Sequence, residues 1–137
     1  MAPTMTLTLA VTGGTGFVGG HVLEAARARG HDVRALARRP QPARDGVEWV
    51  GGDLADLPAL ARLVEGADAV IHVAGVVNAR NAAGFAAGNI AGTAAMRMVS
   101  GGRPFVHVSS LAAREPRLSI YGASKMEAEH VVRGCAG

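Results

Sequence analysis

Residues 12–19 read Thr-Gly-Gly-Thr-Gly-Phe-Val-Gly and stand between an apolar run and an amphipathic stretch. The apolar run at 7–12 predicts a short strand, and apolar residues at helical spacing over 17–29 predict a helix. Glycines recur at every third position, as in a loop that turns from a strand into a helix beside a pyrophosphate. This stretch therefore predicts the first strand–turn–helix unit of a nucleotide-binding α/β fold.

The three glycines of this spacing have different predicted roles. Gly13 permits the tight turn, Gly16 lets the backbone approach a pyrophosphate, and Gly19 lets the helix pack closely on the strand. Backbone amides at the helix start would point at the phosphates, where the helix dipole favours negative charge. The predicted phosphate-binding residues are Gly13, Thr15, Gly16, Phe17, Val18 and Gly19. The alternative is a glycine-rich turn with a purely structural role.

The rest of the chain repeats the alternation of strand and helix. Further strands are expected at 32–37, 47–50, 69–73 and 104–108, and further helices at 56–64, 89–99 and 121–133. The strands are continuous apolar runs with short connections, as in parallel sheets covered on both faces. We therefore predict a three-layer α/β/α fold, a Rossmann-type doubly wound parallel sheet of about five strands in the order 3-2-1-4-5. The Ala/Gly-rich stretch 79–88 is expected to be a loop.

Length and composition exclude several classes of protein. The 137 residues fit one domain over 1–137, and 49% hydrophobic residues exclude a disordered chain. A single cysteine excludes a disulfide scaffold or a multi-cysteine zinc site, and no metal site is expected.

No apolar run approaches the roughly 18 residues of a membrane helix, and residues 1–10 do not resemble a signal peptide, so we expect a cytoplasmic protein without membrane contact. The net charge of +3 is spread along the chain and aromatic residues are few, so no nucleic-acid partner is expected.

The end of the second predicted strand bears on the choice of nicotinamide cofactor. Rossmann units that bind NAD usually carry an acid at this place, to accept a hydrogen bond from the ribose 2′-hydroxyl. Here Ala37 falls near that place and Arg38 and Arg39 follow it. A guanidinium at Arg38 would pair with a 2′-phosphate through charge-assisted hydrogen bonds, so we predict NADP, with NAD as the second choice. The alternative is two solvated arginines before a proline.

A second motif lies near the chain end, where Tyr121-Gly122-Ala123-Ser124-Lys125 reads Y-x-x-x-K. Residues four apart on a helix share a face, so the phenol of Tyr121 and the ammonium of Lys125 are expected to lie together. An ammonium stabilises a nearby phenolate, which suits Tyr121 to exchange a proton while hydride moves between a nicotinamide and a substrate carbon. Ser109 and Ser110 follow the preceding predicted strand at 104–108.

These motifs together resemble the short-chain dehydrogenase/reductase superfamily, and in particular its extended, epimerase/dehydratase-like branch. The resemblance covers nearly the whole chain. It implies that Ser110 holds the substrate oxygen, with Ser109 as the second choice, and that Asn89 helps to position a water or the lysine. It also implies that Lys125 contacts the nicotinamide ribose beside Tyr121.

Further cofactor contacts follow from the same resemblance. Asp53 and Leu54 would lie along the adenine, although Asp53 is equally consistent with a simple loop acid. Ala74 and Gly75 would leave room for the cofactor after the fourth strand. His72 lies within that strand and is expected to be a packed histidine and not a catalyst.

Extended members of this superfamily continue well beyond the place of Gly137, so the C-terminal substrate-binding region is expected to be absent. The fifth strand would then have an open edge, and we expect self-association into a homo-oligomer. The resemblance implies an NADP-dependent oxidoreductase or epimerase/dehydratase-type enzyme acting on a small-molecule substrate. The alternative is a nucleotide-binding module or subunit without turnover.

Overall fold

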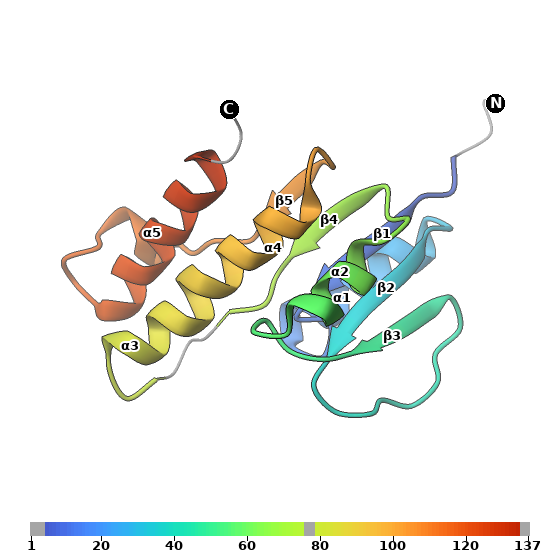
Figure 1. Ribbon diagram of the computed structural model, residues 1–137, viewed down its shortest axis with the longest axis horizontal. Helices are drawn as coiled ribbons and strands as arrows, with labels where there is room; N and C mark the ends of the chain where they lie inside the picture. Colours follow the sequence, from blue (N-terminus) through green and yellow to red (C-terminus); the bar gives the residue numbers. More distant parts are fainter. Residues whose placement is uncertain (1–4, 76–78, 135–137) are drawn as a thin grey trace.

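The computed structural model describes residues 5–75 and 79–134, which form a five-stranded parallel sheet with helices on both faces (Figure 1). The strands are β1 (Thr8–Thr12), β2 (Asp32–Ala37), β3 (Val47–Gly51), β4 (Ala69–His72) and β5 (Phe105–His107). Their order is β3-β2-β1-β4-β5, and every neighbouring pair is parallel. The sheet and its strand order confirm the prediction from the sequence.

The described residues also form seven helical segments, of which five lie between strands and two follow β5. They are α1 (Phe17–Ala28), α2 (Leu57–Val64), α3 (Ala82–Phe85), the π-helix η1 (Ala86–Ala91), α4 (Gly92–Ser100), the 3₁₀ helix η2 (Leu111–Arg114) and α5 (Ile120–Gly134). The parallel arrangement places the carboxyl ends of all five strands at one edge of the sheet, which is where open α/β sheets bind ligands.

The hydrophobic core has two parts, one on each face of the sheet. Helix α1 buries Leu23 and Ala26 against Val11 and Val33 on one face. On the other face, Leu60 and Leu63 of α2 and Met96 of α4 are fully buried in the second cluster, which includes Val70 of β4. Alternate residues of one strand therefore face different helices, which explains why the strands read as continuous apolar runs.

The expected loop at 79–88 is wrong over most of its length. Helix α3 starts within it and continues through η1 into α4, so that Figure 1 shows one unbroken helical stretch. The side chain of Asn81 caps α3 by accepting a hydrogen bond from the Gly84 amide at 3.1 Å, and Phe85 is buried. Alanine-rich segments form helices readily, but alanine and glycine give no hydrophobic period, and this concealed the helix in the sequence.

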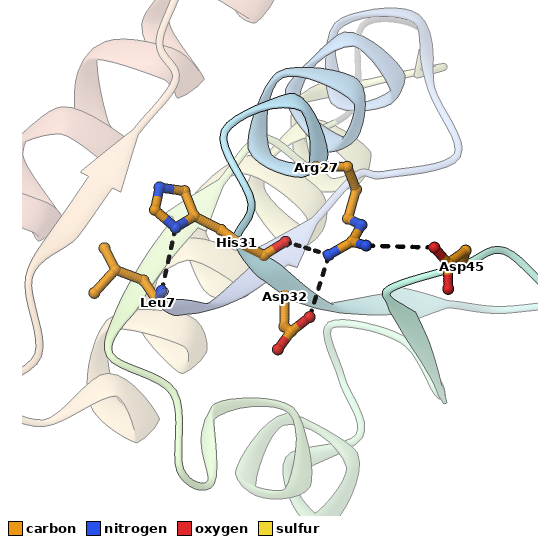
Figure 2. A network of polar contacts seen from close by, with 5 residues as sticks. All are labelled: Leu7, Arg27, His31, Asp32 and Asp45. Carbon is orange, nitrogen blue, oxygen red and sulfur yellow. Dashed lines mark hydrogen bonds and ion pairs between the residues drawn. The ribbon is translucent and has the colours of Figure 1, made fainter. Parts of the chain in front are cut away.

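The opposite edge of the sheet is tied together by Arg27, at the end of α1 (Figure 2). Its Nη1 atom donates to the carbonyl oxygen of His31 at 2.8 Å and to Oδ1 of Asp32 at 3.2 Å, and Nη2 lies 3.6 Å from Oδ2 of Asp45. Gly46 has φ +73°, and a Cβ there would overlap the guanidinium. Arg27 thus supplies contacts that order the fold at the end of the strands away from the ligand-binding edge.

Candidate active site

The loop between β1 and α1 is closed by two of its glycines. Gly13 has φ +76°, and a Cβ on it would lie 2.7 Å from the Ala74 amide nitrogen. A Cβ on Gly19 would lie 1.7 Å from the Gly13 carbonyl oxygen, so the first turn of α1 packs directly on the loop. Both positions therefore require glycine for the fold itself, as the spacing predicts.

Gly16 differs from its two neighbours in the motif, because the protein alone does not require glycine there. Its φ is −89°, and the single contact of an added Cβ would be an ordinary 3.5 Å to the Gly13 oxygen. Gly16 is also the N-cap of α1 and offers no side chain to the helix amides. The predicted neighbours Thr15, Phe17 and Val18 are exposed. Open space in front of uncapped amides fits a bound pyrophosphate.

The predicted adenine-side residues follow β2 and β3 at the carboxyl edge of the sheet, and each has different surroundings. Arg38 is exposed directly after β2 and has no polar partner within residues 5–75 and 79–134. Asp53 uses Oδ1 to accept a hydrogen bond from the Ala55 amide at 2.8 Å, which is the loop role that the sequence left open. Leu54 packs on the helix backbone at Gly92, where a Cβ would lie 2.7 Å from its Cδ1.

Thr12 joins the ends of β1 and β4, a role that the sequence did not reveal. Its Oγ1 accepts hydrogen bonds from the amides of Val73 and Ala74, both at 3.1 Å, and lies 2.7 Å from Nδ1 of His72. These contacts fix the backbone before Gly75, which is exposed. The predicted small residues Ala74 and Gly75 are therefore held next to the glycine loop.

His72 is fully buried, as expected of a packed histidine. Its Nε2 atom lies 3.0 Å from Oγ1 of Thr93, and its ring stacks on that of His107 with centroids 5.6 Å apart. Burial lowers the pKa of His72 to about 3, and the charges of His107 and Lys125 act in the same direction. The imidazole is therefore neutral at physiological pH.

The two residues of the Y-x-x-x-K motif lie on α5, four positions apart. Lys125 is buried, with 4% of its surface exposed, and its Nζ atom donates to the Val108 carbonyl oxygen at 3.0 Å. Burial lowers the pKa of the Lys125 ammonium, and the carboxylate of Glu129 partly opposes this shift. Tyr121 is half-buried, with its ring tilted against that of Phe85 at a centroid distance of 5.9 Å.

Asn89 and Lys125 converge on the backbone at Gly75. A Cβ on Gly75 would lie 2.9 Å from Oδ1 of Asn89 and 3.6 Å from Nζ of Lys125. Asn89 is buried within η1, and its Nδ2 atom donates to Oγ of Ser124 at 3.0 Å. Ser124 in turn donates to the Tyr121 carbonyl oxygen at 2.7 Å. The wide π-helical turn thus presents Asn89 to the helix that carries both predicted catalytic residues.

The two serines after β5 have different surroundings. Ser110 is the N-cap of η2, and its Oγ accepts a hydrogen bond from the Ala112 amide at 3.1 Å. Oγ of Ser109 is buried and has no hydrogen-bond partner in the described part of the chain. A Cβ on Gly122 would lie 2.5 Å from the Ala112 oxygen, so α5 rests closely on η2. This contact, which the motif alone did not reveal, holds Tyr121 and Ser110 in neighbouring elements.

Comparison with known proteins agrees with this geometry. The family model described as NAD dependent epimerase/dehydratase family matches residues 9–137. Ceramide reductase of Caulobacter vibrioides is 47% identical in an alignment 131 residues long, which covers 91% of this chain and 41% of that protein. The solved structure of MoeE5 with UDP-glucose and NAD has a TM-score of 0.82 and 26% identity, over 95% of this chain and 49% of that one.

A short-chain dehydrogenase/reductase superfamily protein from Agrobacterium tumefaciens, solved with bound NAD, has a TM-score of 0.81 and 30% identity. It is matched over 93% of this chain and 44% of its own length, so the chain spans about half or less of these relatives. Across the described residues, no helix is both long and apolar enough to span a bilayer. By name, the relatives include a reductase, a UDP-N-acetylglucosamine 4-epimerase from Bacillus cereus and a protein solved with bound NAD. The chain therefore belongs to the NAD-dependent epimerase/dehydratase family, within the extended short-chain dehydrogenases/reductases.

Proposed function

We propose that the protein is an NADP-dependent reductase with a Ser110–Tyr121–Lys125 site. The observation that carries this proposal is the convergence of Asn89 and the buried Lys125 on Gly75, beside the helix turn of Tyr121. A lysine is rarely buried for a structural reason alone, because removing an ammonium from water is costly. The arrangement supports a site where a proton and a hydride are delivered to one carbonyl group.

Each residue has a definite role in the proposed reaction. The nicotinamide cofactor supplies the hydride that reaches the carbonyl carbon. Ser110 accepts from the Ala112 amide, so its hydroxyl hydrogen is left to bind the substrate oxygen. Tyr121 gives its phenolic proton to that oxygen, and the charge of Lys125 stabilises the phenolate that remains. Lys125 also binds the nicotinamide ribose in this proposal. Asn89 holds the turn of α5 that carries Tyr121, through its hydrogen bond to Ser124.

The choice of NADP rests on Arg38. Its side chain is exposed directly after β2, and β2 ends in Ala37 where an acid would select NAD. A free guanidinium at this point suits a 2′-phosphate. The remaining adenine contacts, Asp53 and Leu54, do not distinguish the two cofactors.

The substrate proposed is a ketone on a long apolar molecule. The support is the 47% identity with a ceramide reductase, whose name denotes a lipid substrate. In addition, the exposed apolar side chains in and between η2 and α5, near Ser110 and Tyr121, are those of Leu111, Leu118 and Ile120. Apolar side chains at a site entrance favour an apolar substrate.

A nucleotide-binding module without turnover is the second candidate, because the close packing at Gly13 and Gly19 and the open space at Gly16 account for nucleotide binding alone. The test combines calorimetry with NADPH and an assay of NADPH oxidation with a long-chain ketone. Tyr121→Phe should lower turnover by roughly 100-fold or more with little change in NADPH affinity. NADPH binding without turnover, in the unmodified protein, supports the module.

Self-association of the chain into a homo-oligomer stays a prediction, and light scattering of the purified protein tests it.

Two serine variants form a matched pair in the same assay. Ser110→Ala should lower turnover, since it removes the donor to the substrate oxygen. Ser109→Ala should leave turnover unchanged, because it removes only a buried hydroxyl that has no partner in residues 5–75 and 79–134. The reverse outcome would exchange the roles of the two serines.

A further inference from the structure

A continuous set of buried hydrogen bonds links the cofactor loop to the helix of Tyr121. The buried network consists of Thr12, His72, Thr93, Asn89 and Ser124, all with 5% or less of their surface exposed. Its steps are Thr12–His72 at 2.7 Å, His72–Thr93 at 3.0 Å, Thr93 to the Asn89 carbonyl oxygen at 2.8 Å and Asn89–Ser124 at 3.0 Å. Ser124 completes it by donating to the Tyr121 carbonyl oxygen at 2.7 Å.

The hydrogen bonds of Thr12 determine one nitrogen of His72. Oγ1 of Thr12 accepts from two amides, those of Val73 and Ala74, which uses both of its lone pairs. Its own hydrogen must therefore point to Nδ1 of His72, and Nδ1 must carry no proton. A protonated Nδ1 would face a hydroxyl that cannot accept a third bond.

The other nitrogen is determined independently by Thr93. Its hydroxyl donates to the Asn89 carbonyl oxygen, so toward His72 it can only accept. Nε2 of His72 must therefore carry the proton. The hydrogen bonds at Nδ1 and at Nε2 therefore require the same neutral tautomer of His72. With this tautomer, each hydroxyl of the network donates one hydrogen bond and accepts at least one.

We propose that His72, as the neutral tautomer protonated on Nε2, is a positioning residue that couples the glycine loop to Tyr121 through Thr93 and Asn89. The proposal rests on the proposed function only in taking Tyr121 as the catalytic residue. The network joins β1, β4, η1, α4 and α5, and each of its side chains has one arrangement that satisfies all partners. A shift of the loop at Thr12 is thereby passed to the turn that carries Tyr121.

Two variants of Thr93 separate the network from ordinary packing. Thr93→Val keeps the shape of the side chain but removes the acceptor for His72 and the donor to Asn89. Thr93→Ser keeps the hydroxyl and serves as the conservative rescue. If only the packing of Thr93 mattered, valine would be tolerated better than serine, because serine leaves a cavity in place of the threonine methyl group.

The first measurement is ¹⁵N NMR of the histidine side chains, which tells a protonated ring nitrogen from a bare one without any cofactor or substrate. We expect His72 to be the Nε2–H tautomer in the unmodified protein and in Thr93→Ser. In Thr93→Val we expect the Nε2 signal to move. A His72 ring protonated on Nδ1, or one that exchanges between tautomers, would overturn the proposal.

The second measurement uses Tyr121 as a reporter, because it is the only tyrosine of the chain. The probe is ADP, which carries the pyrophosphate but no nicotinamide riboside that touches Tyr121 directly. Saturating ADP should shift the ring signals of Tyr121 in the unmodified protein and in Thr93→Ser, and should shift them by less than half as much in Thr93→Val. Equal shifts in all three proteins contradict the coupling.

The two proposals fail in different ways. If ADP and NADPH do not bind, the proposed function fails, and the network is then judged from the free protein alone. In that case Thr93→Val, but not Thr93→Ser, must still alter the Tyr121 ring signals, and unaltered signals overturn the inference. If both nucleotides bind and the coupling is absent, only the inference fails.

Discussion

Lys125 donates from Nζ to the carbonyl oxygen of Val108, 3.0 Å away, and so ties helix α5 to the segment that follows β5. Val108 stands two residues before Ser110, so this bond sets the distance between the helix of Tyr121 and the serine that is proposed to hold the substrate. The ammonium is buried and its protein acceptor is an uncharged carbonyl oxygen, so removing its charge leaves no buried carboxylate without a counter-ion.

Lys125→Met should therefore abolish function while it preserves the fold. We expect turnover to fall by roughly 100-fold or more and NADPH affinity to fall as well, because the ammonium is proposed to serve both steps. The free energy of unfolding should change by no more than about 1–2 kcal/mol, because an apolar chain of similar length replaces a buried charge. Urea denaturation and calorimetry measure the two effects. Arg133→Met, on the exposed end of the same helix, is the control and should affect neither.

Single substitutions in the glycine loop distinguish an effect on ligand affinity from an effect on the stability of the fold. Gly16→Ala should fold normally, because the added methyl meets only an ordinary 3.5 Å contact. We expect the affinity for NADPH to fall by roughly 10-fold or more, because the methyl occupies the space needed for the approach of a pyrophosphate. Unchanged affinity would contradict a pyrophosphate at this loop.

Two further glycines give the matched controls for that experiment. Gly19→Ala should lower the free energy of unfolding by about 3 kcal/mol or more, because its Cβ would overlap the Gly13 carbonyl oxygen. Gly20→Ala meets no atom within 4 Å and should stabilise α1 by about 0.5–1 kcal/mol. Thermal or chemical denaturation of the three variants checks this order.

Cofactor choice is tested at Arg38. Arg38→Ala should weaken NADPH binding by about 1.5–3 kcal/mol, the value of a hydrogen bond to a charged group, and should leave NADH binding nearly unchanged. Arg29→Ala is the matched control, because Arg29 is also exposed but follows α1 at the opposite edge of the sheet. Equal affinities for the two cofactors in the unmodified protein, unaffected by Arg38→Ala, would disprove NADP selectivity.

The buried histidines predict that stability falls in acid. The pKa of His72 is about 3 in the folded protein against an ordinary value of 6.5, so between these values the unfolded chain binds a proton that the folded chain does not. The free energy of unfolding should therefore decrease as the pH falls below 6.5, approaching about 1.4 kcal/mol per pH unit for this one group. Burial also lowers the pKa of His107, and this adds to the loss in the same direction.

Denaturation curves between pH 7 and pH 4.5 measure that slope. His72→Gln should show a smaller slope than the unmodified protein, although its stability at pH 7 will also be lower. His130→Gln, at an exposed position of α5, should keep the full slope. An NMR titration in which His72 takes up a proton near pH 6.5 would contradict the argument directly.

Much of the fold is predictable from the sequence because its signals are local. The glycine spacing at 12–19 and the apolar strands depend on neighbouring residues, and the structure has the tight turn and the parallel strands where they are predicted. The helix within 79–88 was missed because its stability comes from Phe85 packing and from the Asn81 cap, not from an apolar period.

The site was predictable in its residue types but not in its connections. Tyr121, Lys125 and Asn89 stand out by motif, whereas Thr12 and His72 meet across sixty positions of sequence, and no local pattern indicates such a pair. Ser124 and Gly122 occupy the variable places of the Y-x-x-x-K motif, where nothing marks their contacts to Asn89 and Ala112 in advance. Long-range hydrogen bonds appear only once the sheet order brings their partners together.

The π-helix η1 has a consequence for how this region tolerates length changes. Its turn holds one residue more than an α-helical turn, so the segments before and after it are rotated by about 100° relative to an unbroken α-helix. Removing one alanine from Ala86–Ala91 would produce a more regular helix and at the same time turn Asn89 away from Ser124 or Phe85 away from Tyr121. The irregular turn therefore sets the rotation of one helical segment relative to the next. This rotation allows the Phe85–Tyr121 ring contact and the Asn89–Ser124 hydrogen bond to form together.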